Sequence, residues 1–334
     1  MANIIFSEGS NLNDSVFGKS QAPIKFFLEK RGESFEQQSI AKQIFSMETS
    51  ANALEKLTSM TAMDGPKPVG ENGAYPTDGF QEGYSKTIEH MTWKDSFAIS
   101  QEMIEDNKIL DLKGRPEAFI TAHYRTREKF AAALLGGAAV GAADTISFSG
   151  RTFDITCADG DRLFSTSHTT KVSAENQTNL YSNAFSVEAL GKVESAMQTY
   201  KDDNGNILDV SPDTIIIPNI YALKAKVFAA IGSEKDPDTA NNAHNYQFGR
   251  WTVIIWPYLN QYITSGTSPW ILMDSQYNKT YKGAVWFDRI PLTIRSEIDP
   301  GTDANIWKGR ARWSAGFVDW RAFAVGGVSG GTAL

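Results

Sequence analysis

The spacing of hydrophobic residues changes along this chain, and each spacing predicts a different kind of element. Between Ser34 and Met63, apolar residues recur three and four positions apart, as they do on one face of a helix. The stripe consists of Ile40, Ile44, Met47, Ala51, Leu54, Leu57 and Met60. We therefore predict one long helix here, docked either on the core of its own chain or on a neighbouring subunit.

Strict alternation in the C-terminal third predicts strands with one buried face. From Trp307 to Phe317, every second residue is apolar or glycine, and Lys308, Arg310, Arg312 and Ser314 occupy the other face. The basic face is either a solvated sheet surface, a set of intersubunit ion pairs or a contact with nucleic acid. Further strands are expected at residues 92–99, 251–256, 270–273 and 292–298.

Capping signals delimit three further helices and a central strand. Pro116 opens and Gly136-Gly137 ends a helix at about 115–137, and Ser186 caps a helix with a buried stripe from Val187 to Tyr200. Thr214–Ile217 is apolar on both faces, as a central strand would be. The helix that follows, at 219–231, is expected to direct Leu223, Val227 and Phe228 inward.

The segment from Asp64 to Lys86 cannot form a core of its own, because it holds five glycines and three prolines. Loops of this length within a domain are usually functional or disordered. Tyr75, Phe80 and Tyr84 recur within it. These aromatic residues predict a projecting hairpin that contacts another molecule.

The composition narrows the class of protein. The chain has 334 residues, a net charge of −7 and a single cysteine, Cys157, so it has no internal disulfide framework and fits synthesis in a reducing cytoplasm. Nucleic-acid binders usually carry a basic surplus, but an acidic chain can enclose nucleic acid without adhering to it. The N-terminus lacks signal-peptide features, and no apolar run reaches the roughly 18 residues that span a membrane.

The sequence offers no convincing catalytic or metal-binding constellation. Gly327–Gly331 matches G-x-S-x-G, but only three residues follow it, so the Asp and His of a hydrolase triad cannot come later. His168 lies near Asp161 and several hydroxyl residues, where a polar loop is the favoured interpretation. Asp202–Asn206 lacks the ligand spacing of a calcium loop. We expect no enzyme activity, no cofactor and no metal.

The order of the elements resembles that of the major capsid proteins of tailed bacteriophages, which have the Hong Kong 97-type fold. Residues 115–137 are similar to the spine helix of that family. Four further segments carry the resemblance, namely "FAISQEMIED" (97–106), "DRLFSTSH" (161–168), "GNILDVSPDTIIIP" (205–218) and "ARWSAGFVDWRAFAV" (311–325).

The resemblance implies an α+β fold with an N-terminal arm, an extended loop, and two domains. The arm with its helix would comprise residues 1–63 and the extended loop residues 64–92. The peripheral domain, with the spine helix, would comprise 93–182 and 285–334, and the axial α/β domain 183–284. The intersubunit contact candidates are Ile44, Met47, Leu54, Tyr75, Phe80, Tyr84, Lys86, Arg310 and Arg312.

The resemblance also implies a function. The chain would assemble with copies of itself into pentamers and hexamers, and these into an icosahedral shell that encloses phage double-stranded DNA without sequence-specific binding. Implied partners are a separate scaffold protein, a portal and decoration proteins, with no membrane. Assembly would occur in the cytoplasm of the bacterial host, and the product would belong to the virion. The alternatives are an encapsulin-like nanocompartment shell protein and a β-rich hydrolase.

Overall fold

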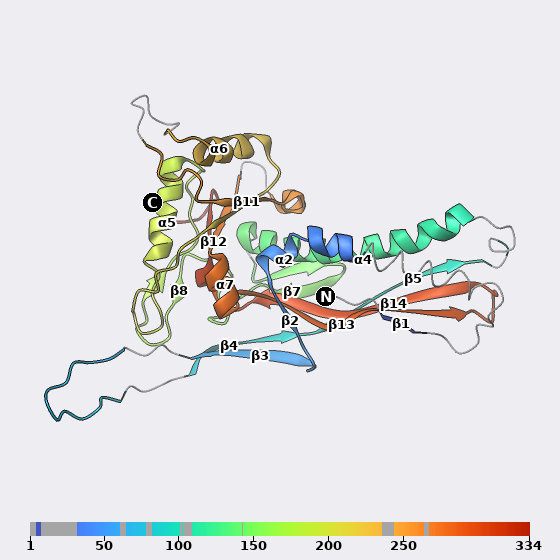
Figure 1. Cartoon of the computed structure of the whole chain (residues 1–334), viewed down its shortest axis with the longest axis horizontal. Coiled ribbons are helices and arrows are strands. Elements are labelled where there is room, and N and C mark those ends of the chain that lie inside the picture. The colour runs from blue at the N-terminus through green and yellow to red at the C-terminus, as the bar shows by residue number, and fades with distance from the viewer. Residues whose placement is uncertain are drawn as a thin grey trace. The chain divides into compact units, whose positions relative to one another are not determined.

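The computed structural model describes residues 5–7, 32–60, 65–77, 82–100, 102, 109–141, 143–235, 244–263 and 267–334. The chain divides into two compact units. The first contains Met1–Glu55, Ile88–Ala131 and Trp286–Ala315, and the second contains Lys56–Thr87, Ala132–Val285 and Gly316–Leu334. Each unit therefore combines segments that are far apart in the sequence (Figure 1).

A five-stranded sheet organises the first unit. Its order is β1 (Ile5–Ser7), β13 (Ala284–Ile298), β14 (Asn305–Phe317) and β5 (Met91–Ile99), and β2 (Ser46–Thr49) also pairs with β13. Strands β5 and β14 are antiparallel, with Ile99 opposite Asn305 and Met91 opposite Trp313. The predicted strands at 92–99, 292–298 and 307–317 are thus confirmed.

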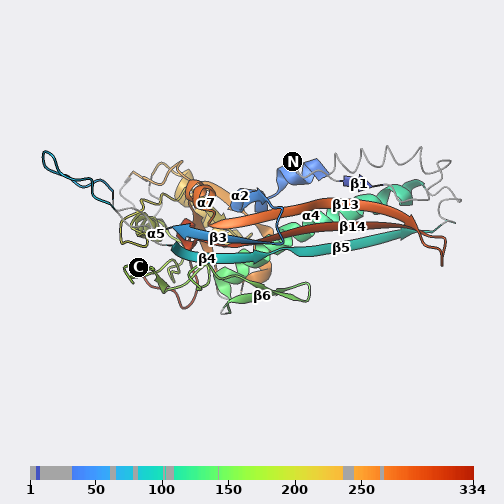
Figure 2. The same ribbon diagram turned by 90° about the horizontal axis from the view of Figure 1, so that it is seen from below.

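Helix α4 (Ile109–Val140) runs along these strands (Figure 2). Between the helix and the sheet, Trp313 stacks on Trp93 at 4.2 Å and on Trp286 at 4.7 Å, and Phe130 of the helix meets Trp313 edge-on at 5.2 Å. Gly309 leaves room for a helix residue, since a Cβ there would lie 2.3 Å from the ring of Phe119. The apolar face of β14 is therefore the buried one, as its alternation predicts.

The long helix predicted from Ser34 to Met63 is wrong. Residues 32–38 are helical, helix α2 spans Ala41–Ile44, and the chain continues as strands β2 and β3 (Leu54–Met60). The helix ends because Phe45 adopts an extended conformation, and β3 pairs with β4 (Glu82–Glu89). Pairing with a distant strand thus overrides a local spacing that suits a helix.

The predicted ends of α4 also need correction. The helix begins at Ile109, before Pro116, and continues to Val140 through Gly136 and Gly137. A Cβ at Gly136 would lie 2.8 Å from Tyr262 Cβ, and one at Gly137 would lie 2.3 Å from Ile146 Cγ2. These glycines allow close packing within the second unit and do not terminate the helix.

A four-stranded sheet forms the core of the second unit, in the order β11 (Thr252–Ile255), β10 (Thr214–Ile217), β12 (Trp270–Met273) and β15 (Phe323–Gly326). All residues of β10 are buried, as predicted, and β10 is parallel to β11 and antiparallel to β12. Helix α5 (Val187–Gln198) begins at the predicted cap, where Ser186 Oγ accepts a hydrogen bond from the Ala189 N–H at 3.0 Å.

Helix α6 (Tyr221–Gly232) buries Leu223 and Val227, but Phe228 is 49% exposed and does not point inward as predicted. The remaining elements are short: η1 (Pro257–Tyr262), α7 (Ser275–Tyr281), η2 (Trp320–Ala322), and the hairpins β6–β7 (Thr145–Phe148, Arg151–Asp154) and β8–β9 (His168–Thr169, Asn176–Gln177). None of the helices in the described ranges has both the length and the apolar composition to cross a membrane.

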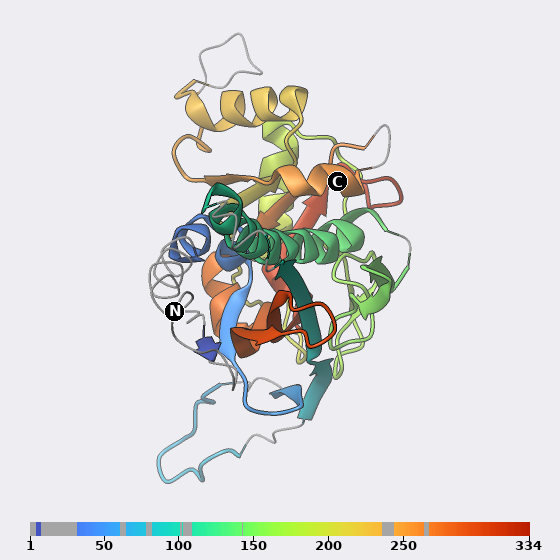
Figure 3. The same ribbon diagram turned by 90° about the vertical axis from the view of Figure 1, so that its right-hand side faces the viewer.

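Strands β3 and β4 form a two-stranded ribbon whose connecting loop extends away from the rest of the second unit (Figures 1 and 3). Residues 66–77 of this loop are all exposed. The projecting hairpin predicted from the aromatic residues of this segment is therefore present, and residues 66–77 add no buried side chain to the described part of the chain.

Candidate functional site

The ribbon and its loop carry four of the residues singled out from the sequence. Tyr75 is 95% exposed at the loop, and Phe80 lies outside the described residues. Tyr84 is half-buried near the start of β4, at the loop end of the ribbon, where its hydroxyl donates to the Thr169 carbonyl at 3.2 Å. Burial and the nearby carboxylates of Asp159 and Asp203 raise the pKa of Tyr84, so it stays a neutral donor.

Lys86 is engaged within its own chain. It is only 8% exposed, and its Nζ lies 2.5 Å from Asp154 Oδ2 and 2.6 Å from Thr156 Oγ1. Although burial alone would raise it, the contacts with Lys86 and Thr156 hold the pKa of Asp154 below its ordinary value. The ammonium group therefore fastens β4 to the segment after β7.

The three candidates of the N-terminal stripe do not share one face. Ile44 is fully buried, Met47 is half-buried and Leu54 is 46% exposed. The chain turns between residues 32–38 and α2, where the Ala41 N–H donates to Glu128 Oε2 at 3.3 Å. Of the three, Leu54 is the most exposed.

Arg310 and Arg312 lie on the face of β14 opposite its tryptophans. Arg310 is exposed and stands opposite Lys94 of β5, and Arg312 is half-buried opposite Thr92. Lys308, on the same face, pairs with Glu297 of β13. Within the described ranges, the buried Nε of Arg312 has no hydrogen-bond partner. The face is basic, as the alternation predicts.

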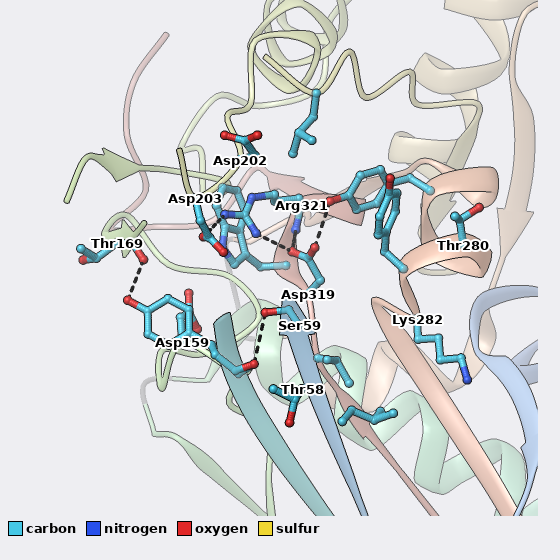
Figure 4. Close-up of a pocket in the computed structure, with 18 residues that line it drawn as sticks. Thr58, Ser59, Asp159, Thr169, Asp202, Asp203, Thr280, Lys282, Asp319 and Arg321 are labelled. Atoms are coloured by element: carbon cyan, nitrogen blue, oxygen red, sulfur yellow. Dashed lines mark hydrogen bonds and ion pairs between the residues drawn. The ribbon is translucent and has the colours of Figure 1, made fainter. Parts of the chain in front are cut away.

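A pocket of about 450 Å³ in the second unit was not anticipated from the sequence (Figure 4). Strands β3 and β4 contribute Ser59 and Tyr84 to its lining, and helix α7 contributes Tyr277. The remaining polar lining includes Asp159, Asp203, Asp319 and Arg321. Because these residues come from six separate segments, no local pattern in the sequence could reveal the pocket.

Arg321 is the electrostatic centre of the pocket. Its guanidinium lies 3.1 Å from Asp203 Oδ1 and 3.3 Å from Asp319 Oδ1, and its Nε donates to the Lys201 carbonyl at 2.9 Å. Burial opposes its charge, but Asp319, Tyr277 and Asp203 together raise the pKa of Arg321. The Tyr277 hydroxyl donates to Asp319 Oδ2 at 2.9 Å, and burial and that carboxylate raise the pKa of Tyr277. The charged and hydroxyl groups of this cluster thus supply one another's ion pairs and hydrogen bonds.

Asp159, Asp161 and His168 have ligand atoms within 4.8 Å of one another, which raises the question of a metal site. However, His168 Nδ1 lies 2.7 Å from Asp159 Oδ2, and Nε2 lies 3.2 Å from Asn179 Oδ1. Both ring nitrogens therefore face protein oxygens, and neither is directed at an open position where a metal could sit. The partners of His168 also differ from those of a catalytic triad, because neither is a serine hydroxyl.

A model of the family described as "Phage capsid protein" matches residues 83–326, which is more than half of the chain. The chain belongs to the phage capsid protein family. This membership confirms the class of function expected from the sequence and favours it over the nanocompartment and hydrolase alternatives. No curated protein matches the chain.

Solved capsid structures share the fold of this capsid protein. The capsid of Ralstonia phage GP4 matches with 10% identity and a TM-score of 0.54, covering 85% of this chain and 86% of that one. The capsid structure of the Cyanophage P-SCSP1u matches with 10% identity and a TM-score of 0.52, covering 87% and 88% respectively. The expected Hong Kong 97-type capsid fold is thereby confirmed.

In this capsid protein, the motifs that resembled catalytic groups are buried or hydrogen-bonded within the fold. Cys157 is 2% exposed, and burial raises the pKa of its thiol well above the ordinary value. The G-x-S-x-G segment belongs to a C-terminal tail that is tied down, since Val328 is 5% exposed and the Thr332 N–H donates to the Leu180 carbonyl at 2.8 Å. Asp202 Oδ1 accepts the N–H groups of Asn204 and Asn206, as in a simple turn.

Proposed function

We propose that this capsid protein is the major subunit of a phage head, forming pentamers and hexamers that close into an icosahedral shell around double-stranded DNA. The observation that carries the proposal is the family match over residues 83–326, which includes segments of both compact units. The net charge of −7 suits a wall that encloses DNA without binding a particular sequence.

The assembly mechanism we propose is the addition of many modest contacts between identical subunits. Residues 66–77 are exposed and lack a core of their own, so a neighbouring subunit is their natural packing partner. A closed symmetric shell makes each later contact effectively intramolecular, so weak contacts add up to a stable structure.

Different segments of the chain would form the arm, the loop and the two domains of the subunit. We propose residues 1–63 as the arm, 64–92 as the extended loop, 93–182 with 285–334 as the peripheral domain and 183–284 as the axial domain. Strand β15 (Phe323–Gly326) pairs with β12, so the sheet of the axial segment takes its edge strand from the C-terminal part. The candidates Tyr75, Phe80, Tyr84, Lys86, Ile44, Met47, Leu54, Arg310 and Arg312 remain proposals for intersubunit contact.

The proposed partners and location follow from the same function. A separate scaffold protein, a portal and decoration proteins would join copies of this chain, and assembly would take place in the cytoplasm of the bacterial host. The finished shell would be part of the virion, and the subunit itself would catalyse no reaction.

Electron microscopy of the purified full-length protein tests the proposal. We expect closed shells or rings of five and six subunits, at protein concentrations and salt conditions varied over a screen. Monodisperse monomers under every condition, including co-expression with its candidate scaffold, would contradict it. If shells form in a host carrying the phage genome, DNA as their content supports a phage head, whereas protein cargo would support a nanocompartment.

A further inference from the structure

His168 is a fully buried histidine whose ring faces an oxygen on each side. Its Nδ1 lies 2.7 Å from Asp159 Oδ2, and its Nε2 lies 3.2 Å from Asn179 Oδ1. The side chain of His168 has no exposed surface, and that of Asp159 is 5% exposed. Water therefore has little access to either ring nitrogen, so the protein groups decide which protons the ring carries.

The hydrogen bonds of Asn179 fix the orientation of its amide. Asn179 Oδ1 accepts the Ser165 N–H at 2.9 Å, while Nδ2 donates to the carbonyls of Leu163 at 2.7 Å and Phe323 at 3.1 Å. A flipped amide would place its NH₂ against an N–H and its oxygen against two carbonyls. The group that faces His168 Nε2 is therefore an oxygen, which can only accept.

A neutral imidazole carries one N–H, so it can satisfy only one of these two oxygens and must direct a lone pair at the other. An imidazolium donates to both. Trp320 stacks on the ring at 4.2 Å and 8°, and an aromatic face favours a cation. The charged groups around the ring are Asp159, Asp161 and, beside Trp320, Arg321.

We infer that His168 is held as an imidazolium and acts as a proton-dependent latch that joins Asp159 to Asn179 and Trp320. The charge balances within the site, because Asp159 supplies the carboxylate that the imidazolium needs. When the ring releases its second proton, one of the two nitrogens faces a buried oxygen without a hydrogen bond, and the latch weakens. The latch is therefore closed at low pH and opens as pH rises.

The latched segment also holds the loop end of the ribbon. His168 and Thr169 form β8, and the Thr169 carbonyl accepts the Tyr84 hydroxyl of β4. Two residues later, Lys171 Nζ donates to the carbonyls of Glu82 at 2.6 Å and Gly83 at 2.8 Å. The protonation of His168 thus sets how firmly β4 is anchored, and its consequence for shell assembly rests on the proposed function.

The first test measures the protonation of His168 directly. Full-length protein labelled with ¹⁵N in its histidine rings gives signals for four histidines. The signal that is missing from the spectrum of His168→Gln belongs to His168. At neutral pH we expect both nitrogens of His168 to carry protons. A ring with one unprotonated nitrogen would overturn the inference. This readout needs only the folded subunit, so a failure to form shells would not affect it.

The second test measures the anchorage of β4 by hydrogen exchange at residues 82–87, expressed as protection relative to the intrinsic rate. In the unmodified protein we expect protection to fall several-fold between a low pH, at which the ring carries both protons, and a high pH, at which it has lost one of them. His168→Gln should give low protection that does not change with pH. His244→Gln, at an exposed histidine, is the matched control and should behave like the unmodified protein.

Equal protection at both pH values in the unmodified protein would overturn the coupling between His168 and the ribbon. If His168→Gln does not fold, the comparison of the two pH values in the unmodified protein and in His244→Gln still decides the question.

Discussion

At the scale of single residues, Arg321 shows how tightly the buried charges of the second unit depend on one another. Its side chain is 14% exposed and its guanidinium contacts both Asp203 and Asp319, so its removal leaves two carboxylates in a poorly solvated pocket. We expect Arg321→Met to lower the free energy of unfolding by about 3 kcal/mol, as happens when one partner of a buried ion pair is lost. Urea denaturation of the unassembled protein measures this.

An exposed ion pair supplies the control. Lys192 contacts Glu188 at 3.0 Å one turn along α5, and their side chains are 45% and 78% exposed. Water and salt screen such pairs, so Lys192→Met should cost less than about 0.5 kcal/mol. Similar losses in the two variants would mean that the pocket does not hold Arg321 as the geometry indicates.

His123 lowers the stability of the folded protein at acidic pH. Burial, together with the positive charge of Arg127, lowers the pKa of His123 to about 3. The unfolded chain binds this proton near pH 6.5, at about the ordinary value for histidine. Because the depressed pKa favours the neutral form in the fold, the stability it supports is complete above about pH 6.5 and declines as pH falls toward about pH 3.

We therefore expect His123→Gln to lose stability less steeply on acidification than the unmodified protein. A fully buried group would contribute about 1.4 kcal/mol per pH unit, and the half-buried ring of His123 contributes less than that. Urea midpoints at about pH 7 and about pH 4.5 measure the difference in slope. Parallel losses would refute the assignment, since the titrating carboxylates are common to both proteins.

At the scale of elements, the adjacent glycines Gly136 and Gly137 near the end of α4 lower its helix propensity but permit close packing. Gly136→Ala would favour an isolated helix, but its Cβ would lie within 2.9 Å of three atoms at the inner end of the Tyr262 side chain. These atoms cannot swing away without moving the backbone of η1. We expect a loss of about 1–3 kcal/mol in urea denaturation, the usual range for overpacking.

Gly232, the last residue of α6, tests the same substitution without the clash. A Cβ there meets no atom within 4 Å among the described residues, so Gly232→Ala should be neutral or stabilise by up to about 1 kcal/mol. A loss from Gly232→Ala as large as that from Gly136→Ala would show that the packing around Tyr262 is not the cause.

Elements whose signals are local could be predicted from the sequence. The cap at Ser186, the apolar run Thr214–Ile217 and the strand Trp270–Met273 all lie where expected, because capping and burial on both faces leave a mark in a few residues. The stripe at Leu54 failed, since its spacing fits a helix while its partner strand begins at Glu82. A short stretch of sequence contains no information about pairing between strands that lie this far apart in the chain.

At the scale of the whole molecule, the order of motifs predicted the family, but the candidate site could not be predicted in the same way. The pocket around Arg321 is lined by six separate segments, and the oxygens around His168 come from positions 159 and 179. The short separation of Asp161 and His168 in the sequence indicates the correct loop but the wrong carboxylate. The carboxylate that lies 2.7 Å from His168 Nδ1 is that of Asp159. The order of motifs along the sequence thus predicts the fold, whereas the polar networks become apparent only in the three-dimensional structure.

The exposed loop of the ribbon provides the test of assembly at this scale. Replacing residues 66–76 with a short Gly-Ser link removes surface that makes no core, so the unfolding midpoint should change by no more than a few degrees, while electron microscopy should find no closed shells. Tyr75→Ser should reduce the yield of shells, because a large exposed ring is a typical interface anchor, and Tyr75→Phe should retain it. Normal shells from the shortened loop would refute its role, and equal losses from both Tyr75 variants would assign the contact to the hydroxyl.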